Sequence, residues 1–424
     1  MVVVGMLSVS CCYRLLKPKG LREPSRALNR LRFPLFPSVL PQAGFRFSRS
    51  RMEYSTDIKP SSLYWNREEC KSKELSSSIE GPITKAGHIF AIADPEDKFN
   101  ENLYSGSLPE GCQLLKVGTC LTDFQSSVAE SPLLQPNIIF ISHPNARDTL
   151  IELLEAYPTI EWVQTRSAGV DHLLSISDGT LSYLPTNVQL TNAKGMYSST
   201  LAEYALMTCS YFAKDLPRLL HQKSRLEWIQ YPIQELRGST MGIVGYGDIG
   251  RACAKLAKVY GMTVLGLKRT KSVELQSVDP YCDQFYYDSE GGLYEMLSRS
   301  DYILVSTPLT KQTRGLISKE ALSKCQSTAV IINVGRGPII DEEALIEALT
   351  SGAIKGAGLD VTTIEPLPKD SQLWNLDNVL LSPHNMDMTT TFMKESTDFF
   401  IQENLTRFVR GKMLLNPVDK FAGY

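Results

Sequence analysis

Short apolar runs alternate with segments of helical period from residue 88 onward, and this alternation predicts an α/β protein. Apolar runs with few polar interruptions are typical of parallel strands that are buried on both faces. In the first half of the chain they predict strands at residues 88–93, 137–142, 160–164 and 188–191. A helix is expected at residues 149–156, with an inward face of Leu150, Ile151, Leu153 and Leu154. A long helical pattern at residues 199–218 would lead into the second half of the chain.

The second half continues the pattern and predicts a second parallel sheet. Strands are expected at residues 241–244, 263–267, 302–305, 329–334, 356–361 and 379–381. The helix at residues 342–351 has clear limits, because Asp341 is a good N-cap and Gly352 follows the last turn. Its inward face would consist of Ala344, Leu345, Ala348 and Leu349. A last helix, at residues 392–410, is expected to return to the first domain.

The strand at residues 241–244 leads into a glycine-rich turn. Gly245, Gly247 and Gly250 have the G-x-G-x-x-G spacing, and a helical pattern follows until Gly261. The apolar stripe of this helix would consist of Ile249, Ala252, Cys253, Leu256, Ala257 and Tyr260. The first glycine allows the turn, the second lets the backbone approach a pyrophosphate, and the third lets helix and strand pack closely. Glycine turns are also common as purely structural features, but the flanking strand and helix favour a dinucleotide site here.

The end of the next strand indicates which dinucleotide is preferred. The acidic residue that would bind the ribose 2′-hydroxyl of NAD is absent, and the chain has Lys268, Arg269 and Thr270 instead. A guanidinium binds a phosphate through paired hydrogen bonds, so we expect NADPH or NADP to be preferred, with NAD(H) still possible. The alternative is that these residues are solvated charges at a strand end.

Composition and charge narrow the functional classes. A chain of 424 residues with 43% hydrophobic residues is long enough for two or three globular domains. The net charge of -2 provides no basic surface for nucleic acid, and no apolar run is long enough to span a membrane. The nine cysteines include no C-x-x-C pair, which favours a reducing compartment, and the five histidines lack ligand spacing, so we expect no metal.

The first 51 residues differ from the rest of the chain. They contain ten Lys or Arg residues but only one acidic residue, Glu23. This composition is typical of an organellar transit peptide, and residues 14–33 could form a basic amphipathic helix. We therefore expect import into a mitochondrion or chloroplast. The alternatives are a disordered basic tail or a cytosolic product that starts at Met52. Residues 52–85 are polar and are interpreted as a linker.

Three side chains that follow later strands form a candidate catalytic set, Arg336, Glu365 and His384. If a bound dinucleotide reduces a 2-keto acid, hydride must reach the carbonyl carbon and a proton must reach the oxygen. His384 is the natural proton donor near neutral pH, and Glu365 would keep its imidazolium charged and oriented. Arg336 would bind the substrate carboxylate and polarise the keto oxygen, while the N–H groups of Ala168 and Gly169 would hold the other side of the carboxylate. Each residue alone has an ordinary structural explanation, but together they favour catalysis.

The ordered motifs of residues 88–420 resemble the D-isomer-specific 2-hydroxyacid dehydrogenase family. These motifs are Ser-Ala-Gly-Val-Asp at 167–171, the Gly-x-Gly-x-x-Gly turn, Gly-Arg-Gly at 335–337, Leu-Asp-Val with Glu-Pro-Leu-Pro at 359–368, and Pro-His at 383–384. The resemblance implies catalytic roles for Arg336, Glu365 and His384, and places Asp360 near the nicotinamide carboxamide. The cofactor-binding residues expected together are Gly245, Gly247, Asp248, Ile249, Gly250, Lys268, Arg269, Thr270, Thr307, Pro308, Val334 and Asp360.

The expected fold is therefore α/β, with two flavodoxin-like or Rossmann-like domains, each a doubly wound parallel sheet, and an active-site cleft between them. Residues 86–196, completed by residues 393–424, would form the substrate domain. Residues 197–392 would form the NAD(P)-binding domain. The resemblance also implies a homodimer through the cofactor domains.

The expected activity is reduction of a small 2-keto acid by NADPH to the D-2-hydroxy acid, most like the glyoxylate/hydroxypyruvate reductases. The alternative is a non-catalytic dinucleotide-responsive binding protein, as in the corepressor branch of the family. Formate dehydrogenases are a weaker alternative, because they have Gln where Glu365 stands. The family usually has small residues after the histidine, whereas this chain has Asn385-Met-Asp-Met388, which could reshape the pocket. We interpret Asp387 as the N-cap of the helix that follows.

Overall fold

The computed structural model describes residues 79–130, 133–174, 184–269 and 279–423. Side chains are described for these residues except 126–130. The predicted presequence with its possible helix at residues 14–33, residues 52–78 of the predicted linker, and Thr270 lie outside the described residues. Within the described residues, no helix is both long and apolar enough to span a membrane.

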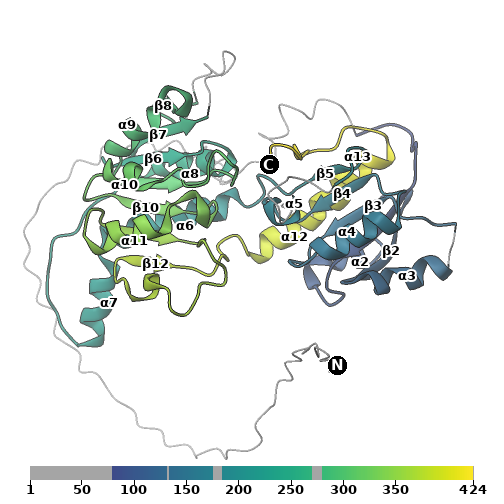
Figure 1. Ribbon diagram of the computed structural model, residues 1–424, viewed down its shortest axis with the longest axis horizontal. Helices are drawn as coiled ribbons and strands as arrows, with labels where there is room; N and C mark the ends of the chain where they lie inside the picture. Colours follow the sequence, from purple (N-terminus) through teal and green to yellow (C-terminus); the bar gives the residue numbers. More distant parts are fainter. Residues whose placement is uncertain (1–78, 131–132, 175–183, 270–278, 424) are drawn as a thin grey trace, which may run out of the picture. The chain divides into compact units, whose positions relative to one another are not determined.

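The first sheet has five parallel strands in the order β2-β1-β3-β4-β5 (Figure 1). The strands are β1 (Gly87–Ile92), β2 (Cys112–Gly118), β3 (Ile138–Ile141), β4 (Trp162–Thr165) and β5 (Gln189–Thr191). In register, Ile89 of β1 lies opposite Ile138 of β3, which in turn lies opposite Trp162 of β4. This is the flavodoxin-like strand order, so the expectation for the first domain is confirmed.

The second sheet has seven parallel strands in the order β12-β11-β10-β9-β6-β7-β8. The strands are β6 (Thr240–Val244), β7 (Thr263–Lys268), β8 (Gln284–Tyr287), β9 (Tyr302–Val305), β10 (Val330–Asn333), β11 (Gly356–Leu359) and β12 (Val379–Leu381). The chain reverses direction along the sheet between β6 and β9, as in a doubly wound dinucleotide-binding fold. Loops that follow β6 and β9 therefore begin at the position where such sheets bind ligands.

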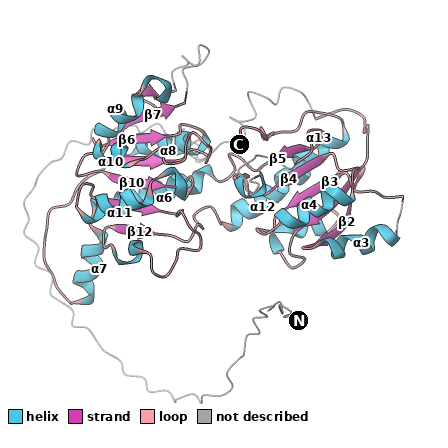
Figure 2. Ribbon diagram, viewed as in Figure 1, coloured by secondary structure: helices cyan, strands magenta, loops and turns pink. Residues whose placement is uncertain are grey.

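Helices flank the strands of both sheets (Figure 2). On one face of the second sheet the core includes residues of α9 (Gly292–Ser298), α10 (Lys319–Ser323) and α11 (Glu342–Thr350). On the other face it includes residues of α6 (Ser198–Ala213) and α8 (Asp248–Val259). Successive residues of a strand point to opposite faces of the sheet. In β9, Ile303 and Val305 therefore belong to the core on the first face, whereas Tyr302 and Leu304 belong to the core on the second.

The first sheet is covered in the same way, partly by the end of the chain. One face packs against α3 (Leu121–Glu130), α4 (Arg147–Ala156) and α5 (Asp171–Leu174). The other face packs against α2 (Glu101–Tyr104), the π-helical segment η7 (Phe400–Leu405) and α13 (Thr406–Val409). Phe400 stacks on Phe140 of β3 with ring centroids 4.5 Å apart. The expected return of the last helix to the first domain, through α12 (Thr390–Phe399), is therefore confirmed.

The remaining described helices are short or lie outside the cores. They are η2 (Lys98–Asn100), α7 (Leu216–Ser224), η4 (Asp288–Glu290), η5 (Gly337–Ile339) and η6 (Gln372–Asn375). The prediction of one long helix at residues 199–218 is wrong, because the chain forms two helices, α6 and α7, with a break between them. Asp215 has a left-handed φ of 51°, which no helix can continue through. α7 then starts at Leu216, and Pro217 lies in its first turn, where the missing N–H of proline is tolerated.

Side-chain directions agree with most predicted helix faces. In α11, Asp341 accepts a hydrogen bond from the Ala344 N–H, and all four predicted inward residues are buried. In α8, Cys253 and Ala257 are buried as predicted, but Tyr260 is 48% exposed, so its place in the inward stripe was wrong. In α4, Leu150 and Leu153 are buried, whereas Ile151 and Leu154 are half-buried.

The N-cap predicted for the last helix is also wrong. Thr389, and not Asp387, caps α12, because its side-chain oxygen accepts a hydrogen bond from the Phe392 N–H. The carboxylate of Asp387 is therefore not used by the helix. Burial raises the pKa of Asp387, although the nearby charge of His384 opposes this effect.

Candidate active site

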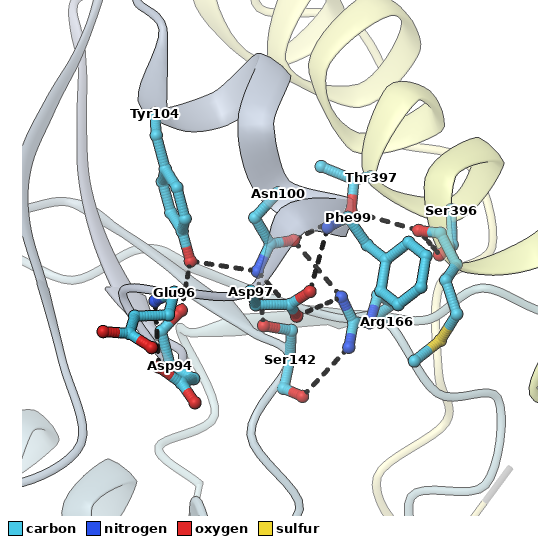
Figure 3. Close-up of polar contacts among 11 residues, drawn as sticks. Asp94, Glu96, Asp97, Phe99, Asn100, Tyr104, Ser142, Arg166, Ser396 and Thr397 are labelled. Carbon is cyan, nitrogen blue, oxygen red and sulfur yellow. Dashed lines mark hydrogen bonds and ion pairs between the residues drawn. The ribbon is translucent and has the colours of Figure 1, made fainter. Parts of the chain in front are cut away.

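The Ser167–Asp171 loop follows β4 and begins next to a buried arginine. The guanidinium of Arg166 lies 2.8 Å from Oδ2 of Asp97, and both side chains are largely buried. Figure 3 shows Asn100 at the centre of the surrounding contacts. Its Nδ2 donates to Asp97 and to the hydroxyl of Ser142, while its Oδ1 accepts from Arg166 and from Thr397 of α12. A buried network of this kind is stable only when its polar groups have partners, and it fixes the start of the loop.

The loop itself is held by side chains at the ends of two strands. Ser167 Oγ donates to the carbonyl of Gly169 at 3.0 Å, and Asn192 donates to the carbonyl of Ala168 at 2.8 Å. Both carbonyls are thus turned toward the protein. The N–H groups of Ala168 and Gly169, which we predicted to bind a carboxylate, have no hydrogen-bond acceptor in the part of the chain that the structure describes.

Arg336 lies in a tight turn after β10 that requires glycine on both sides. A Cβ on Gly335 would lie 2.7 Å from the carbonyl oxygen of Thr307, and a Cβ on Gly337 would lie 2.0 Å from the carbonyl carbon of Thr362. Asn333 closes the turn, because its side chain accepts from the Gly335 N–H and donates to the carbonyl of Arg336. The sequence therefore packs this turn against the loops that follow β9 and β11.

The guanidinium of Arg336 reaches the Ser167–Asp171 loop. Its Nε donates to Oδ1 of Asp171 at 3.1 Å, and its Nη1 donates to the carbonyl of Gly335 at 2.8 Å. Its Nη2 lies 1.4 Å from the position that a Cβ of Gly169 would occupy. The structure therefore brings together the predicted residues Arg336 and Gly169, and adds Asp171, to which we assigned no role from the sequence.

His384 and Glu365 form the ion pair that the sequence suggested. Nδ1 of His384 lies 2.7 Å from Oε2 of Glu365, whose Oε1 accepts from the Thr362 N–H at 3.0 Å. The hydrogen bond that Nδ1 of His384 donates to the Glu365 carboxylate raises the pKa of His384 against the opposing effect of burial. Burial alone would raise the pKa of Glu365, but the hydrogen bonds from His384 and Thr362 outweigh it and lower the pKa.

The backbone of His384 is held in an uncommon conformation. Its φ of 50° lies in the left-handed region, which side chains other than glycine rarely adopt. The His384 N–H donates to the carbonyl of Asp360 at 2.9 Å, and the Asn385 N–H donates to Oδ1 of the same aspartate at 3.2 Å. Ser382 Oγ donates to that Oδ1 at 2.8 Å. Buried Asp360 therefore fixes the turn that carries the histidine, in addition to its predicted place beside the cofactor.

The glycine-rich turn after β6 fits a pyrophosphate. Gly245 has a φ of 94°, and a Cβ there would lie 2.8 Å from the backbone nitrogen of Thr307. A Cβ on Gly250 would lie 2.7 Å from the carbonyl oxygen of Gly245, whereas a Cβ on Gly247 would meet no atom within 4 Å. Gly247 is the N-cap of α8 and makes no side-chain cap. The first-turn N–H groups of this twelve-residue helix are thus accessible to an anionic group through an open position.

The other predicted cofactor residues lie along the same strand ends. Asp248 begins α8 and lies 3.8 Å from Nζ of Lys194, and Ile249 packs partly against the core. Thr307 and Val334 are buried at the ends of β9 and β10, and Pro308 is exposed.

Lys268 lies at the end of β7 over an aromatic surface. Its Nζ is 4.2 Å from the ring centroid of Phe285 and 5.8 Å from that of Tyr246. Arg269 follows and is exposed. The two rings pack edge to face with centroids 5.0 Å apart, and the ammonium group makes cation–π contacts with both of them. The structure therefore keeps two adjacent cations at the end of β7.

Tyr197 is a further residue that the sequence did not suggest. Burial raises its pKa, and the charges that act on it are those of Arg336, Asp387 and Asp248. Its ring meets Phe392 edge to face at 5.1 Å. Neither Tyr197 nor Asp171 could be assigned a role from spacing alone, although Asp171 lies within a motif that we had singled out.

Sequence comparison shows which known proteins the chain is similar to. Residues 206–385 match the sequence model of the D-isomer specific 2-hydroxyacid dehydrogenase NAD binding domain. The chain is 31% identical to a glyoxylate reductase of Korarchaeum cryptofilum, over 63% of this chain and 79% of that protein. It is 30% identical to a hydroxypyruvate reductase of Blautia hydrogenotrophica, over 63% of this chain and 81% of that protein.

A solved structure leads to the same family. The NADPH-dependent glyoxylate/hydroxypyruvate reductase of Sinorhizobium meliloti, in complex with NADP and sulfate, matches with a TM-score of 0.64 and 26% identity. The match covers 80% of this chain and 100% of that one. The chain belongs to the D-isomer specific 2-hydroxyacid dehydrogenase family, and is thus an NAD(P)-dependent oxidoreductase.

Proposed function

We propose that the protein reduces a small 2-keto acid, of the size of glyoxylate or hydroxypyruvate, to the D-2-hydroxy acid and prefers NADPH. The observation that carries this proposal is the His384–Glu365 pair at 2.7 Å, in a site where Arg336 reaches the Ser167–Asp171 loop. A proton donor and a carboxylate-binding cation are the two groups that such a reduction requires from the protein.

His384, Glu365 and Arg336 have different roles in the proposed reaction. The hydride for the carbonyl carbon would be supplied by NADPH when it is bound. Because Nδ1 of His384 is engaged by Glu365, the proton for the keto oxygen comes from Nε2. Glu365 favours the imidazolium before transfer and orients the ring. Arg336 and the N–H groups of Ala168 and Gly169 bind the substrate carboxylate and set the distance between the carbonyl and the histidine.

A substrate screen tests this proposal. The loss of NADPH absorbance would be measured with glyoxylate, hydroxypyruvate and bulkier 2-keto acids, together with NADPH binding by fluorescence. We expect turnover to be fastest with the small acids. Tight NADPH binding without turnover of any 2-keto acid would instead favour a dinucleotide-responsive binding protein.

The preference for NADPH is proposed from Lys268 and Arg269. In the variant Lys268→Ala/Arg269→Asp, we expect the ratio of kcat/KM with NADPH to that with NADH to fall by at least about tenfold, because a charge-assisted hydrogen bond contributes about 1.5–3 kcal/mol. The measurement is kcat/KM with each cofactor at saturating keto acid. Lys324→Ala is a matched control, because Lys324 also lies over an aromatic ring, that of Tyr294, but follows α10. An unchanged ratio would show that these two cations do not bind the 2′-phosphate.

We also propose a homodimer, on the basis of exposed apolar side chains in and after α7. Leu226 and Trp228 are each 95% exposed. Leu219, Leu220, Ile229 and Ile233 in the same segment are also exposed. Apolar residues gathered in one segment are typical of a contact surface, and a second copy would cover them.

Sedimentation equilibrium would test the dimer. We expect Leu226→Ser/Trp228→Ser to shift the protein toward the monomer, because neither side chain contributes to the core of one chain. Leu133→Ser is a matched control, since Leu133 is 96% exposed but lies outside this segment. A wild-type protein that is monomeric, or a double variant that remains dimeric, would rule out this surface.

A further inference from the structure

We propose that Asp171 is a positioning residue that sets the orientation of the Arg336 guanidinium, with Gly169 keeping the space into which the guanidinium extends. This inference rests on the proposed function, in which Arg336 binds the substrate carboxylate. It adds a residue to the site and states how the two loops cooperate.

The hydrogen bonds of Arg336 define which of its edges can meet a ligand. A guanidinium has five N–H donors, and here Nε is used by Asp171 and one Nη1 donor by Gly335. Within the described parts of the chain, Nη2 has no hydrogen-bond acceptor. The edge formed by Nη1 and Nη2 is therefore the one that remains for a carboxylate. Rotation of the group about its side-chain torsions would turn this edge away, and the bond from Nε prevents that rotation.

Electrostatics alone would not explain an acidic residue at this position. Arg336 and Asp171 are 26% and 33% exposed, so the pair is partly hydrated and adds little to the free energy of unfolding. A carboxylate next to an anion-binding arginine also repels the substrate. We therefore attribute to Asp171 an effect on the geometry of Arg336 that outweighs this repulsion.

The position of Asp171 is itself fixed from the interior of the first domain. Figure 3 shows that Arg166, which directly precedes the loop, is bound to Asp97, and that Asn100 connects the two to Thr397 of α12. Because the polar atoms of this network are mutually satisfied and buried, the loop has little freedom to follow a moving guanidinium. Asp171 is thus a fixed point, and Arg336 is the group that it orients.

Gly169 provides an independent observation. A Cβ at Gly169 would lie 1.4 Å from Nη2 of Arg336 and 3.2 Å from Oδ1 of Asp171. The φ of Gly169 is outside the left-handed region, so alanine is compatible with the backbone there. The methyl group of Gly169→Ala would thus push only against the end of the Arg336 side chain and the ion pair, leaving the fold intact.

The experiment compares Asp171→Ala, Asp171→Asn and Gly169→Ala with the wild type, using NADPH with glyoxylate and hydroxypyruvate. We expect Asp171→Ala and Gly169→Ala to raise the KM for the keto acid about 10- to 100-fold, the loss typical of one charge-assisted hydrogen bond, with the Kd for NADPH unchanged. Asp171→Asn keeps an acceptor for Nε and should raise KM less than Asp171→Ala. KM does not depend on the fraction of active protein, so partial misfolding cannot imitate this result.

Two further results decide between positioning and other roles. In the double variant Gly169→Ala/Asp171→Ala, we expect the KM of the worse single variant and not the product of both effects, because both act through Arg336. Glu161→Ala is the control, because it removes an ion pair elsewhere in the same domain, in which Nζ of Lys85 lies 2.6 Å from Oε2 of Glu161. This variant should leave KM unchanged. If the aspartate only repels the substrate, Asp171→Ala and Asp171→Asn will both lower KM, and the inference is wrong. A wild type without turnover of any 2-keto acid would refute the proposed function, whereas normal wild-type turnover with unchanged KM in Asp171→Ala and Gly169→Ala would refute only the role of Asp171.

Discussion

Replacement of His384 by glutamine is expected to lower kcat by about 10²- to 10⁴-fold, the contribution of a well-placed general acid, while NADPH still binds. Glutamine can donate a hydrogen bond to Glu365, so the turn after β12 should be preserved, but it has no proton to transfer to the keto oxygen. The measurement is kcat at saturating substrate, with the Kd for NADPH from fluorescence as the control. If His384→Gln turned over at the wild-type rate, the proton donor would have to be another group.

The pH dependence of kcat is a second test of His384 as the proton donor. Reduction requires protonated His384, so kcat should be level at low pH and fall as pH rises through the pKa of the histidine. Because the hydrogen bond that His384 donates to Glu365 raises that pKa, the fall should lie above the ordinary histidine value of about 6.5. In Glu365→Gln the charge is lost, so we expect the fall to move to lower pH. A profile that does not move would mean that Glu365 does not control the titration.

The strands in the interior of the two sheets were the most predictable part of the fold, because their residues are buried on both faces. β9, for example, has the predicted limits, because a run of apolar residues between turns permits few alternatives. The edge strand β12 also has the predicted limits, although its three residues are only half-buried. The sequence analysis missed β2 and β8, which lie at the edges of the two sheets. Their residues are mostly half-buried, so their sequences include Lys116 and Gln284 and lack a continuous apolar run.

Helix limits were less predictable, because they depend on single backbone conformations. Nothing in the apolar pattern of α6 and α7 signals the left-handed φ of Asp215. Asp387 and Thr389 are both good N-cap residues on sequence grounds, and only the start of the helix decides between them. The choice matters for function, because Asp387 is left as a half-buried carboxyl group close to the charge of His384.

The candidate site was predictable as residues but not as contacts. The motifs identified Arg336, Glu365 and His384, and the structure places His384 and Glu365 in hydrogen-bond contact. The bond between Arg336 and Asp171 joins residues that are 165 positions apart and follow strands of different sheets. Spacing along the chain has no information on such a contact, so a sequence alone could not show which acidic residue orients the arginine.

Replacement of Arg336 by alanine is expected to impair both the chemical step and the binding of the keto acid. The variant loses the group that binds the substrate carboxylate and polarises the keto oxygen, and removing one such donor typically lowers kcat by about 10²- to 10³-fold. Carboxylate binding is lost as well, so kcat/KM should fall further than kcat. The glycines beside Arg336 and the hydrogen bonds of Asn333 shape the turn without the side chain, so the fold and NADPH binding should remain.

The comparison of Arg336→Ala with Arg336→Lys separates charge from geometry. Lysine keeps the positive charge but has a single ammonium group, which cannot donate to Asp171 and present a flat edge to the substrate at the same time. We therefore expect Arg336→Lys to retain part of kcat while its KM for the keto acid rises. In Arg336→Ala, kcat should fall further and KM should rise further. Steady-state kinetics with glyoxylate and hydroxypyruvate would measure both constants, and unaltered thermal melting would confirm the fold. A lysine variant as active as the wild type would show that only the charge is required, and then neither Asp171 nor the shape of the guanidinium could matter to the reaction.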